Sequence, residues 1–498
     1  MGPLDSTIVS VALPSKIGKA LSLSYSQALW VPAAYVLVLS ILLVPLGRIA
    51  DARGRMRFYL VGTAVFGIFS MVCALSPNGT FLIVARCLQA TGAACLSATS
   101  AALVTAVFPP QERGRMLGLN AMAGYLGLTA GPPLGGLIAT HLGWRWIFFV
   151  NVPIALITLA NGWFLMGAEG RDRKAAAEAR RASAGARAGG DAAGPKPGVG
   201  LPAGPASAGR IDWQGTVLLG LGLICLLVPL TLVPFWGWDS ARTIGLLVAA
   251  VVLLAVFAFV EGHSRDPLLD LDLVRKNRVF AAGTFAALLQ YAAVFAITTL
   301  TAVYLEVVEG YSPERAGVVL LVQPVFMAAL SPVFGMLSDR LGSRFLATGG
   351  MLVAAVGISQ LAILPHGTHP LRLVLALAVV GIGMAAFVSP NTSAVMGSVG
   401  RSQLSLASAF LGTMRFLGQG VSVGLLGAIA ASGLGATGAR VIFLGEAASQ
   451  AAADSFSGGY RRAMFVAVGL TLIGALVSLV RGARPEQGAK PEPGGAAV

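Results

Sequence analysis

The feature that most constrains this chain is a series of long apolar segments separated by short polar gaps. Fourteen such segments can be marked, the first at 3–14 and the last at 461–481. A run of about 20 apolar residues is long enough to cross a bilayer as a helix. Only 11% of the residues are charged, whereas soluble domains carry about 25%. The pattern predicts an all-α polytopic membrane protein.

The distribution of basic residues indicates an orientation. The net charge is +14, but no nucleic-acid-binding motif is present, and cytoplasmic loops of membrane proteins are rich in Lys and Arg. If both termini are cytoplasmic, about 24 of the 35 basic residues fall inside. The positive-inside rule therefore favours a multi-pass protein of the cell membrane with both termini in the cytoplasm. No nucleic-acid partner is expected.

Residues for catalysis and cofactor binding are missing from the sequence. No catalytic Ser/His/Asp set, P-loop or dinucleotide fingerprint is present, which argues against an ATP-driven pump and against most enzymes. The cysteines lie in apolar segments without metal-site spacing, as small buried residues usually do: Cys73, Cys87, Cys95 and Cys225. We therefore expect a protein that is not an enzyme and binds neither a cofactor nor a metal.

A stretch rich in Ala, Gly, Pro and Arg divides the apolar segments into a group of six and a group of eight. Such a composition cannot bury a core, so it predicts a disordered cytoplasmic linker. The expected divisions are an N-terminal six-helix bundle at 1–167, the linker at 168–211, two inserted helices at 212–261, a C-terminal six-helix bundle at 262–482 and a disordered cytoplasmic tail at 483–498.

A short motif occurs twice. "GRIADARGRMR" (47–57) and "GMLSDRLGSR" (335–344) share the skeleton Gly, three residues, Asp, two residues, Gly. The copies lie in corresponding gaps, between the second and third segments and between the tenth and eleventh. If two helices are inserted, the chain consists of two similar halves of six helices. Transporters built from repeated halves bind substrate near the midplane between them.

Five ordered motifs resemble the major facilitator superfamily, and within it the 14-helix drug:proton antiporters of the multidrug efflux type. They are "LDSTIVSVALP" (4–14), "GRIADARGRMR" (47–57), "LIVARCLQATGAA" (82–94), "GLTAGPPLGG" (127–136) and "WRWIFFVNVP" (144–153). Two positions depart from the family pattern, with Ser10 where Asn is usual and Ala90 where Gly is usual.

The resemblance implies a fold and a function. The fold would be the major facilitator fold, with two six-helix bundles, two inserted helices and a first helix that is truncated as written. The function would be proton-coupled antiport that exports hydrophobic small molecules, such as drugs, antibiotics or an endogenous product, by alternating access in a monomer. A symporter or facilitator for a metabolite, and a membrane protein that does not transport, remain alternatives.

Two charged residues inside predicted helices are candidates for proton coupling. The resemblance implies this role for Asp5 and Arg86, and charged residues within membrane helices are functional candidates in general. Because burial disfavours a charged carboxylate, such a group can load and unload a proton. Met1 stands only four residues before Asp5, so an interfacial aspartate is the alternative unless about ten N-terminal residues are missing. For Arg86 the alternative is a structural role.

The repeated motif is expected to form a gate on the cytoplasmic side. Asp51 can face a helix N-terminus or pair with Arg55 or Arg57, while the glycines permit a tight turn and close approach. Such contacts would hold the two halves together and break when they move apart. For the arginines, a topology signal is the alternative. The gate residues are Gly47, Asp51, Gly54, Arg55, Arg57, Gly335, Asp339, Gly342 and Arg344.

The fourth motif predicts a bent, closely packed helix between the halves, because prolines remove backbone hydrogen bonds and small residues allow close approach. Its residues are Gly127, Gly131, Pro132, Gly135 and Gly136. Other polar residues at membrane depth would line the substrate cavity or hydrogen-bond between helices: Gln89, Gln290, Tyr291, Gln323, Asn391, Arg415 and Gln419. With few acids in the membrane, we expect a neutral, zwitterionic, anionic or monocationic substrate.

Overall fold

The computed structural model describes residues 2–12, 17–21, 23, 25–164, 213–263, 271–365, 369–432 and 450–480. Every regular element in these ranges is a helix, and each of the fourteen predicted apolar segments contains a helix, although some include or end in a turn, as at Leu75 and Leu321. The all-α prediction is therefore confirmed. The predicted linker and the predicted C-terminal tail lie outside the described residues.

The N-terminal half contains seven labelled helices. They are α1 (Gly2–Ala12), α2 (Gly18–Ala20), α3 (Tyr25–Arg53), α4 (Arg55–Ala74), α5 (Gly79–Val107), α6 (Arg113–His141) and α7 (Trp146–Phe149), after which residues 151–164 are helical. The expected inserted pair follows as α9 (Trp213–Trp236) and α10 (Ala241–His263).

The C-terminal half begins after the short α11 (Leu271–Lys276). Two of its long helices continue into a π-helical turn. η2 (Tyr304–Val308) follows α12 (Arg278–Val303), and η4 (Ser422–Leu426) follows α17 (Leu404–Val421). Its other helices are α13 (Pro313–Leu320), α14 (Val322–Leu341), α15 (Ser343–Ala362), α16 (Pro370–Gly397), η3 (Arg401–Gln403), α18 (Gly427–Ala431) and α20 (Gln450–Leu479).

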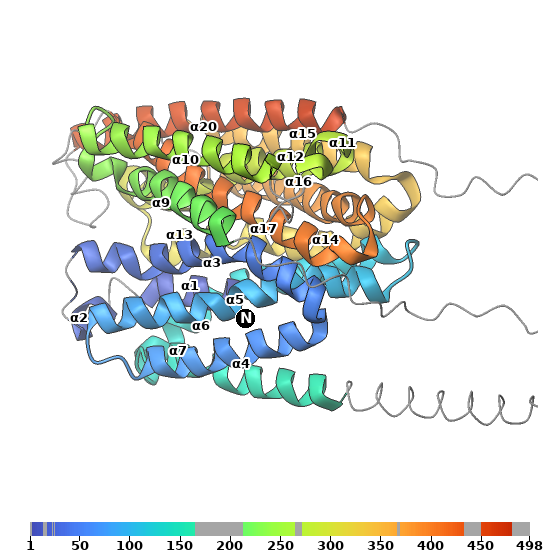
Figure 1. Cartoon of the computed structure of the whole chain (residues 1–498). Coiled ribbons are helices and arrows are strands. Elements are labelled where there is room, and N and C mark those ends of the chain that lie inside the picture. The colour runs from blue at the N-terminus through green and yellow to red at the C-terminus, as the bar shows by residue number, and fades with distance from the viewer. Residues whose placement is uncertain are drawn as a thin grey trace, which may run out of the picture.

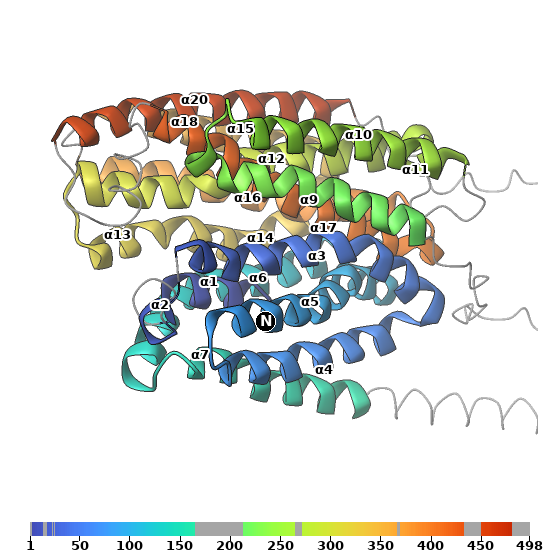
Figure 2. The same cartoon turned by 60° about the vertical axis from the view of Figure 1, so that its left-hand side comes forward.

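The two halves lie against each other with their helices roughly aligned (Figure 1; Figure 2). The N-terminal half is the blue-to-teal layer, and the C-terminal half is the yellow-green-to-red layer with α9 and α10 in green beside it. Across the boundary, α6 packs against α14, and α17 packs against both α3 and α5. Of the inserted pair, α9 packs against α3, α17 and η4, so it touches both halves.

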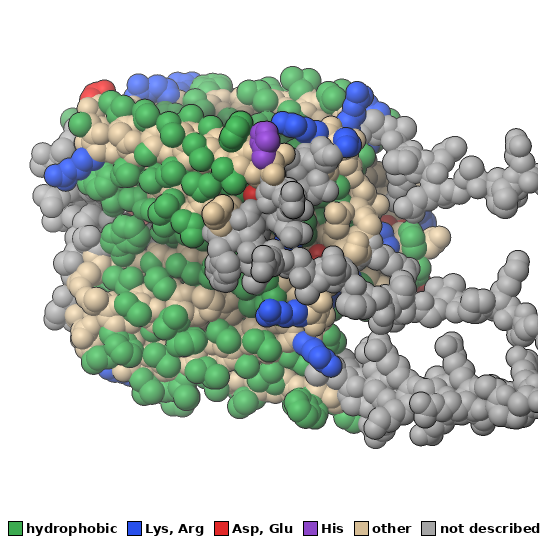
Figure 3. Space-filling model, in the orientation of Figure 1, with side chains coloured by type: hydrophobic (Ala, Val, Ile, Leu, Met, Phe, Trp, Pro, Cys, Tyr) green, Lys and Arg blue, Asp and Glu red, His purple; other side chains and the backbone are tan. Residues whose placement is uncertain are grey.

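The surface suits a lipid environment. Eleven helices in the described residues are long and apolar enough to cross a membrane. Hydrophobic side chains cover much of the described surface in Figure 3. Large apolar side chains are exposed on several helices, such as Ile68 on α4, Phe259 on α10 and Leu476 on α20. Because water would disfavour such a surface, the chain spans a membrane.

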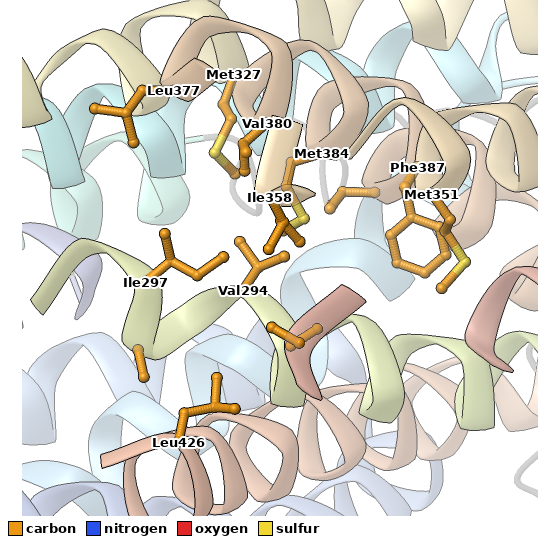
Figure 4. Packing of buried hydrophobic residues seen from close by; sticks show 14 of the residues in the cluster. Val294, Ile297, Met327, Met351, Ile358, Leu377, Val380, Met384, Phe387 and Leu426 are labelled. Atoms are coloured by element: carbon orange, nitrogen blue, oxygen red, sulfur yellow. The ribbon is translucent and has the colours of Figure 1, made fainter. Parts of the chain in front are cut away.

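The interior of the C-terminal half is packed by apolar side chains from several helices. Val294 and Ile297 of α12 lie near Val380 and Met384 of α16 and Ile358 of α15 (Figure 4). All five are less than a tenth exposed. This packed core can hold the polar residues at the boundary with the other half in fixed positions.

Candidate functional site

Asp5 is the centre of a buried polar network. Its side chain lies on α1 and is fully buried. The carboxylate forms an ion pair with Arg86 of α5. It also accepts hydrogen bonds from Gln89 Nε2 at 3.2 Å and from Asn151 Nδ2 at 2.8 Å. The two residues selected for proton coupling, Asp5 and Arg86, are therefore in direct contact.

Arg86 contacts Gln89 and Tyr35 as well as Asp5. Its Nη1 also donates to Gln89 Oε1 at 2.7 Å, and its guanidinium carbon lies 4.1 Å from the ring centre of Tyr35 on α3. Gln89 Nε2 donates further to Ser70 Oγ at 2.7 Å. Desolvated charges are costly unless they are paired and hydrogen-bonded. The ion pair supplies the counter-charge when Asp5 is ionised, while Arg86 Nε is buried without a hydrogen-bond partner among the described residues. A proton on Asp5 would leave the guanidinium without its counter-charge.

Two glycines of the fourth motif let α1 approach α6. A Cβ at Gly127 would lie 3.2 Å from Leu4 N, and a Cβ at Gly135 would lie 3.2 Å from Ile8 Cα. Leu4 and Ile8 flank Asp5 on α1, so these glycines help to set the position of the carboxylate. Gly136 has no such neighbour within 4 Å.

The sequence predicted that this motif would pack between the halves. Instead, these two glycines face α1, which belongs to the same half. The contact of α6 with the other half is made further toward its N-terminus. There a Cβ at Gly118 would lie 2.5 Å from Ser331 O of α14. The helix continues through Pro132 and Pro133, and Gly131 is buried. The side chain of Pro132 lies outside the described residues.

The first copy of the repeated motif joins α3 to the other half. The Asp51 carboxylate, 8% exposed as a side chain, accepts hydrogen bonds from Ser405 N at 3.0 Å and Leu406 N at 2.9 Å. These amides belong to the first turn of α17, where backbone N–H groups lack partners within the helix and carry partial positive charge. Arg55 Nη2 pairs with Asp51 at 2.7 Å, and Arg55 Nε donates to Ser405 Oγ at 3.1 Å.

The second copy makes the same contact in the opposite direction. The Asp339 carboxylate at the end of α14 accepts hydrogen bonds from Gly114 N at 2.9 Å and Arg115 N at 3.0 Å. These amides begin α6 in the N-terminal half. Each half thus presents a carboxylate to a helix N-terminus of the other. We call these two contacts the carboxylate clamps.

The glycines of the skeleton have two distinct uses. Gly54 and Gly342 stand between consecutive helices with φ of 103° and 87°, a left-handed conformation that glycine adopts readily. Gly47 lies where the halves meet, since a Cβ there would be 2.5 Å from Ala409 Cβ. Gly335 is in the equivalent place, because the nearest atom to a Cβ there would be the backbone oxygen of Gly114, which belongs to α6 of the other half.

The arginines of the motif behave differently from one another. Arg55 bridges the one-residue break between α3 and α4, whereas Arg57 is exposed and pairs with no described residue. The guanidinium carbon of Arg344 lies 5.9 Å from the ring centre of Phe345. Of the two partners considered for Asp51, the structure brings Arg55 to the carboxylate. The predicted loop 47–57 is mostly helical, interrupted at Gly54.

A second group of polar and aromatic side chains lies around Arg415 on α17. Arg415 Nη2 donates to Thr392 Oγ1 of α16, and its guanidinium carbon lies 5.8 Å from the ring centre of Tyr291 on α12. Tyr125 of α6 is close enough to Arg415 and Tyr291 to interact electrostatically with both. The group therefore draws on both halves of the molecule.

The other predicted cavity residues are spread along the C-terminal half. Gln290 is fully buried and donates to Met384 Sδ at 3.2 Å. Asn391 donates to Gly283 O at 3.1 Å, and Gln323 accepts from Thr298 Oγ1 at 3.5 Å. These contacts are between helices, the alternative raised for them from the sequence. Gln419 is partly exposed one turn from Arg415.

Several residues of these groups were not selected from the sequence. Asn151 stands inside the quoted block 144–153, and its amide is one of the donors to Asp5. Its polarity within an apolar segment was a usable signal. Tyr35, Tyr125 and Thr392 carry no sequence signal of this kind, because aromatic and hydroxyl side chains are common in membrane helices.

Comparison with known proteins identifies the class of protein to which this fold and these sites belong. The family model of the Major Facilitator Superfamily matches residues 1–423. The chain belongs to this superfamily: it is a membrane transporter of small molecules rather than an enzyme.

Three relatives in sequence are named for drug or antibiotic resistance. The chain is 31% identical to the multidrug resistance protein Stp of Mycobacterium tuberculosis, over 87% of this chain and 74% of the relative. It is 30% identical to the puromycin resistance protein pur8 of Streptomyces alboniger, over 96% of this chain and 88% of the relative. It is 28% identical to the tetracenomycin C resistance and export protein of Streptomyces glaucescens, over 87% and 74%.

A solved structure agrees on the fold. The proton:xylose symporter XylE superposes with a TM-score of 0.57, at 14% identity, over 94% of this chain and 91% of that one. At this identity the likeness shows the major facilitator fold and nothing further. In the described residues no group of three or more His, Cys, Asp or Glu side chains is arranged to hold a metal ion.

Proposed function

We propose that this protein is a proton-coupled antiporter that exports hydrophobic small molecules across the cell membrane by alternating access. The observation that carries the proposal is the fully buried ion pair between Asp5 and Arg86. Protonation of Asp5 removes the charge that balances Arg86, so it changes which conformation of α1 and α5 is favoured. The names of the resistance and export relatives support export of drugs or antibiotics.

The carboxylate clamps would serve as the gate of this cycle. Both join the halves at one end of the helix bundle, which the distribution of basic residues predicts to be cytoplasmic. Each clamp consists of a carboxylate and two backbone N–H groups. Such contacts can form and break without unfolding either helix. The conformation described here is thus the one in which the halves are joined at that end.

The proton site and the group around Arg415 are connected by packed side chains. Tyr35 covers the guanidinium of Arg86 and belongs to a buried apolar cluster that includes Ala90 and Leu43. Phe416, next to Arg415, packs against the same cluster. A shift of Arg86 on protonation of Asp5 would therefore be transmitted through this cluster to α17, the helix that carries Arg415.

The test is drug-driven proton exchange in inside-out vesicles. The lumen is acidified, a panel of lipophilic compounds that includes neutral, cationic and anionic members is added one at a time, and a pH-sensitive dye follows proton release. We expect release with the wild-type protein and none with Asp5→Asn. The control is Asp454→Asn, which removes an exposed acid of α20 and should leave exchange unchanged.

Two outcomes would contradict the proposal. Full exchange in Asp5→Asn would move proton coupling to another group. Accumulation of the compound together with protons, rather than in exchange for them, would favour the symporter that the sequence left as an alternative. Binding of the compound to the purified variant, measured in detergent, separates a coupling defect from a loss of folding.

A further inference from the structure

Arg415 is a membrane-embedded cation with no anionic partner among the described residues. It lies near the middle of the spanning segment Leu404–Ala431. Arg86, the other arginine deep in the membrane, is neutralised by Asp5. Arg415 forms no ion pair with a described carboxylate, and its Nε is buried without a hydrogen-bond partner. A charge in this position is costly and marks a functional site by default.

Hydrogen-bond donors and aromatic rings lie together around Arg415. Its guanidinium has five N–H donors, and one recorded hydrogen bond, to Thr392, uses Nη2. Tyr291 lies beside it, and Tyr125, on a helix of the other half, hydrogen-bonds to Tyr291. Aromatic side chains offer faces on which a ring can stack, and the guanidinium offers a fork that matches a carboxylate. Arg415 is also partly exposed, so it is not sealed by its neighbours.

We infer that Arg415 selects substrates that carry an acidic group on an aromatic or otherwise apolar body. The ionised acid would supply the counter-charge that no described residue provides at this position, and Tyr125 and Tyr291 would contact the apolar part. The inference rests on the proposed export function and makes it more specific. It narrows the substrate class from neutral, zwitterionic, anionic or monocationic compounds to those with an anionic group.

The site is suited to alternating access because its members belong to both halves. Arg415, Thr392 and Tyr291 come from the C-terminal half, and Tyr125 comes from α6 of the N-terminal half. When the halves move apart on one side, the acid can stay on Arg415 while its apolar body loses or gains the contact with Tyr125. Specificity for the acid would thus depend on Arg415, whereas access to the site would depend on the contact with Tyr125.

The test uses three fluorescent probes built on one ring system: anthracene-9-carboxylate, its uncharged carboxamide and the cationic 9-(aminomethyl)anthracene. Binding to the purified full-length protein in detergent is measured by fluorescence anisotropy at pH 7. We expect the wild-type protein to bind the carboxylate at least tenfold more tightly than the carboxamide, with the amine weakest. Arg415→Gln should abolish this preference, and Arg415→Lys should retain part of it.

The controls separate charge recognition from folding. Arg461→Gln removes an exposed arginine of α20 and should keep the wild-type preference. Unchanged affinity of Arg415→Gln for the carboxamide shows that the site is intact. Equal wild-type affinity for carboxylate and carboxamide, or a preference that survives in Arg415→Gln, overturns the inference. If the preference depends on Arg415 but the carboxylate drives no proton exchange in vesicles, the antiport proposal fails and the assignment of the site stands.

Discussion

The carboxylate clamps allow a quantitative prediction for Asp339→Asn. The wild-type carboxylate accepts two backbone hydrogen bonds at the start of α6, at 2.9 and 3.0 Å. A hydrogen bond to a charged group contributes about 1.5–3 kcal/mol, and a carboxylate at a helix N-terminus gains about 0.3–1 kcal/mol from the helix dipole. Asparagine keeps one acceptor oxygen but loses the charge, and Asp339 is partly exposed, which weakens its electrostatic contribution.

From these contributions we expect Asp339→Asn to lose about 1.5–2 kcal/mol of the free energy that favours the joined conformation. The ratio of joined to separated molecules would fall about 10- to 30-fold. Asp51→Asn should lose more, because Asp51 also pairs with Arg55, whose Nε donates a hydrogen bond to Ser405 of the other half. Because both clamps stabilise the same joined conformation, the two losses of free energy should add in the double variant.

Pulsed electron paramagnetic resonance can measure this ratio. Spin labels at Arg57→Cys and Arg340→Cys, both exposed and in opposite halves, report the distance between the halves at the clamp end. The native cysteines are first replaced. Asp239→Asn, an exposed acid between α9 and α10, is the matched control and should give the wild-type distribution. An unchanged distribution in both clamp variants would refute the gate reasoning, as would an equal shift in the control.

Two further predictions concern the Asp5 network. Gly135→Val should push Ile8 and α1 away from α6, because even a Cβ would lie 3.2 Å from the Ile8 backbone, and proton exchange should fall at least tenfold in the vesicle assay. Gly136→Ala, which adds a Cβ with no neighbour within 4 Å, should have no effect, and equal losses in both would refute a role of the α1 contact. Asn151→Ala removes a donor to Asp5, costs about 1.5–3 kcal/mol of interaction, and should slow exchange about tenfold or more at unchanged expression.

The site was partly predictable, for reasons that depend on the kind of residue. Asp5 and Arg86 stand out because charges are rare inside apolar helices, and the contact between them follows once α1 and α5 are adjacent. Tyr125 and Thr392 could not be selected, because their types are ordinary in such helices and their importance comes from the position of Arg415. The expected location of the Gly127–Gly136 stretch between the halves also failed for Gly127 and Gly135, since sequence spacing defines a helix face but not the neighbour of that face.

Residue types and their spacing are enough to define the class of fold. The length and number of apolar runs require membrane helices, because a backbone in lipid must satisfy its own hydrogen bonds. The repeated Gly-Asp-Gly skeleton indicated two similar halves, and its glycines predicted a turn and a close approach. These properties are local, so they can be read from residue types and their spacing.

Which groups meet depends instead on how the helices pack in the folded molecule. The chain positions 51 and 405, or 114 and 339, are joined by hydrogen bonds although hundreds of residues separate them. Nothing in the spacing of either motif specifies that each carboxylate caps a helix of the opposite half. The same is true of Arg415, because the position of every helix packed around it determines that no described carboxylate reaches it. Such properties arise from packing over the whole molecule, and packing distinguishes a charge that is neutralised from one that remains available to a ligand.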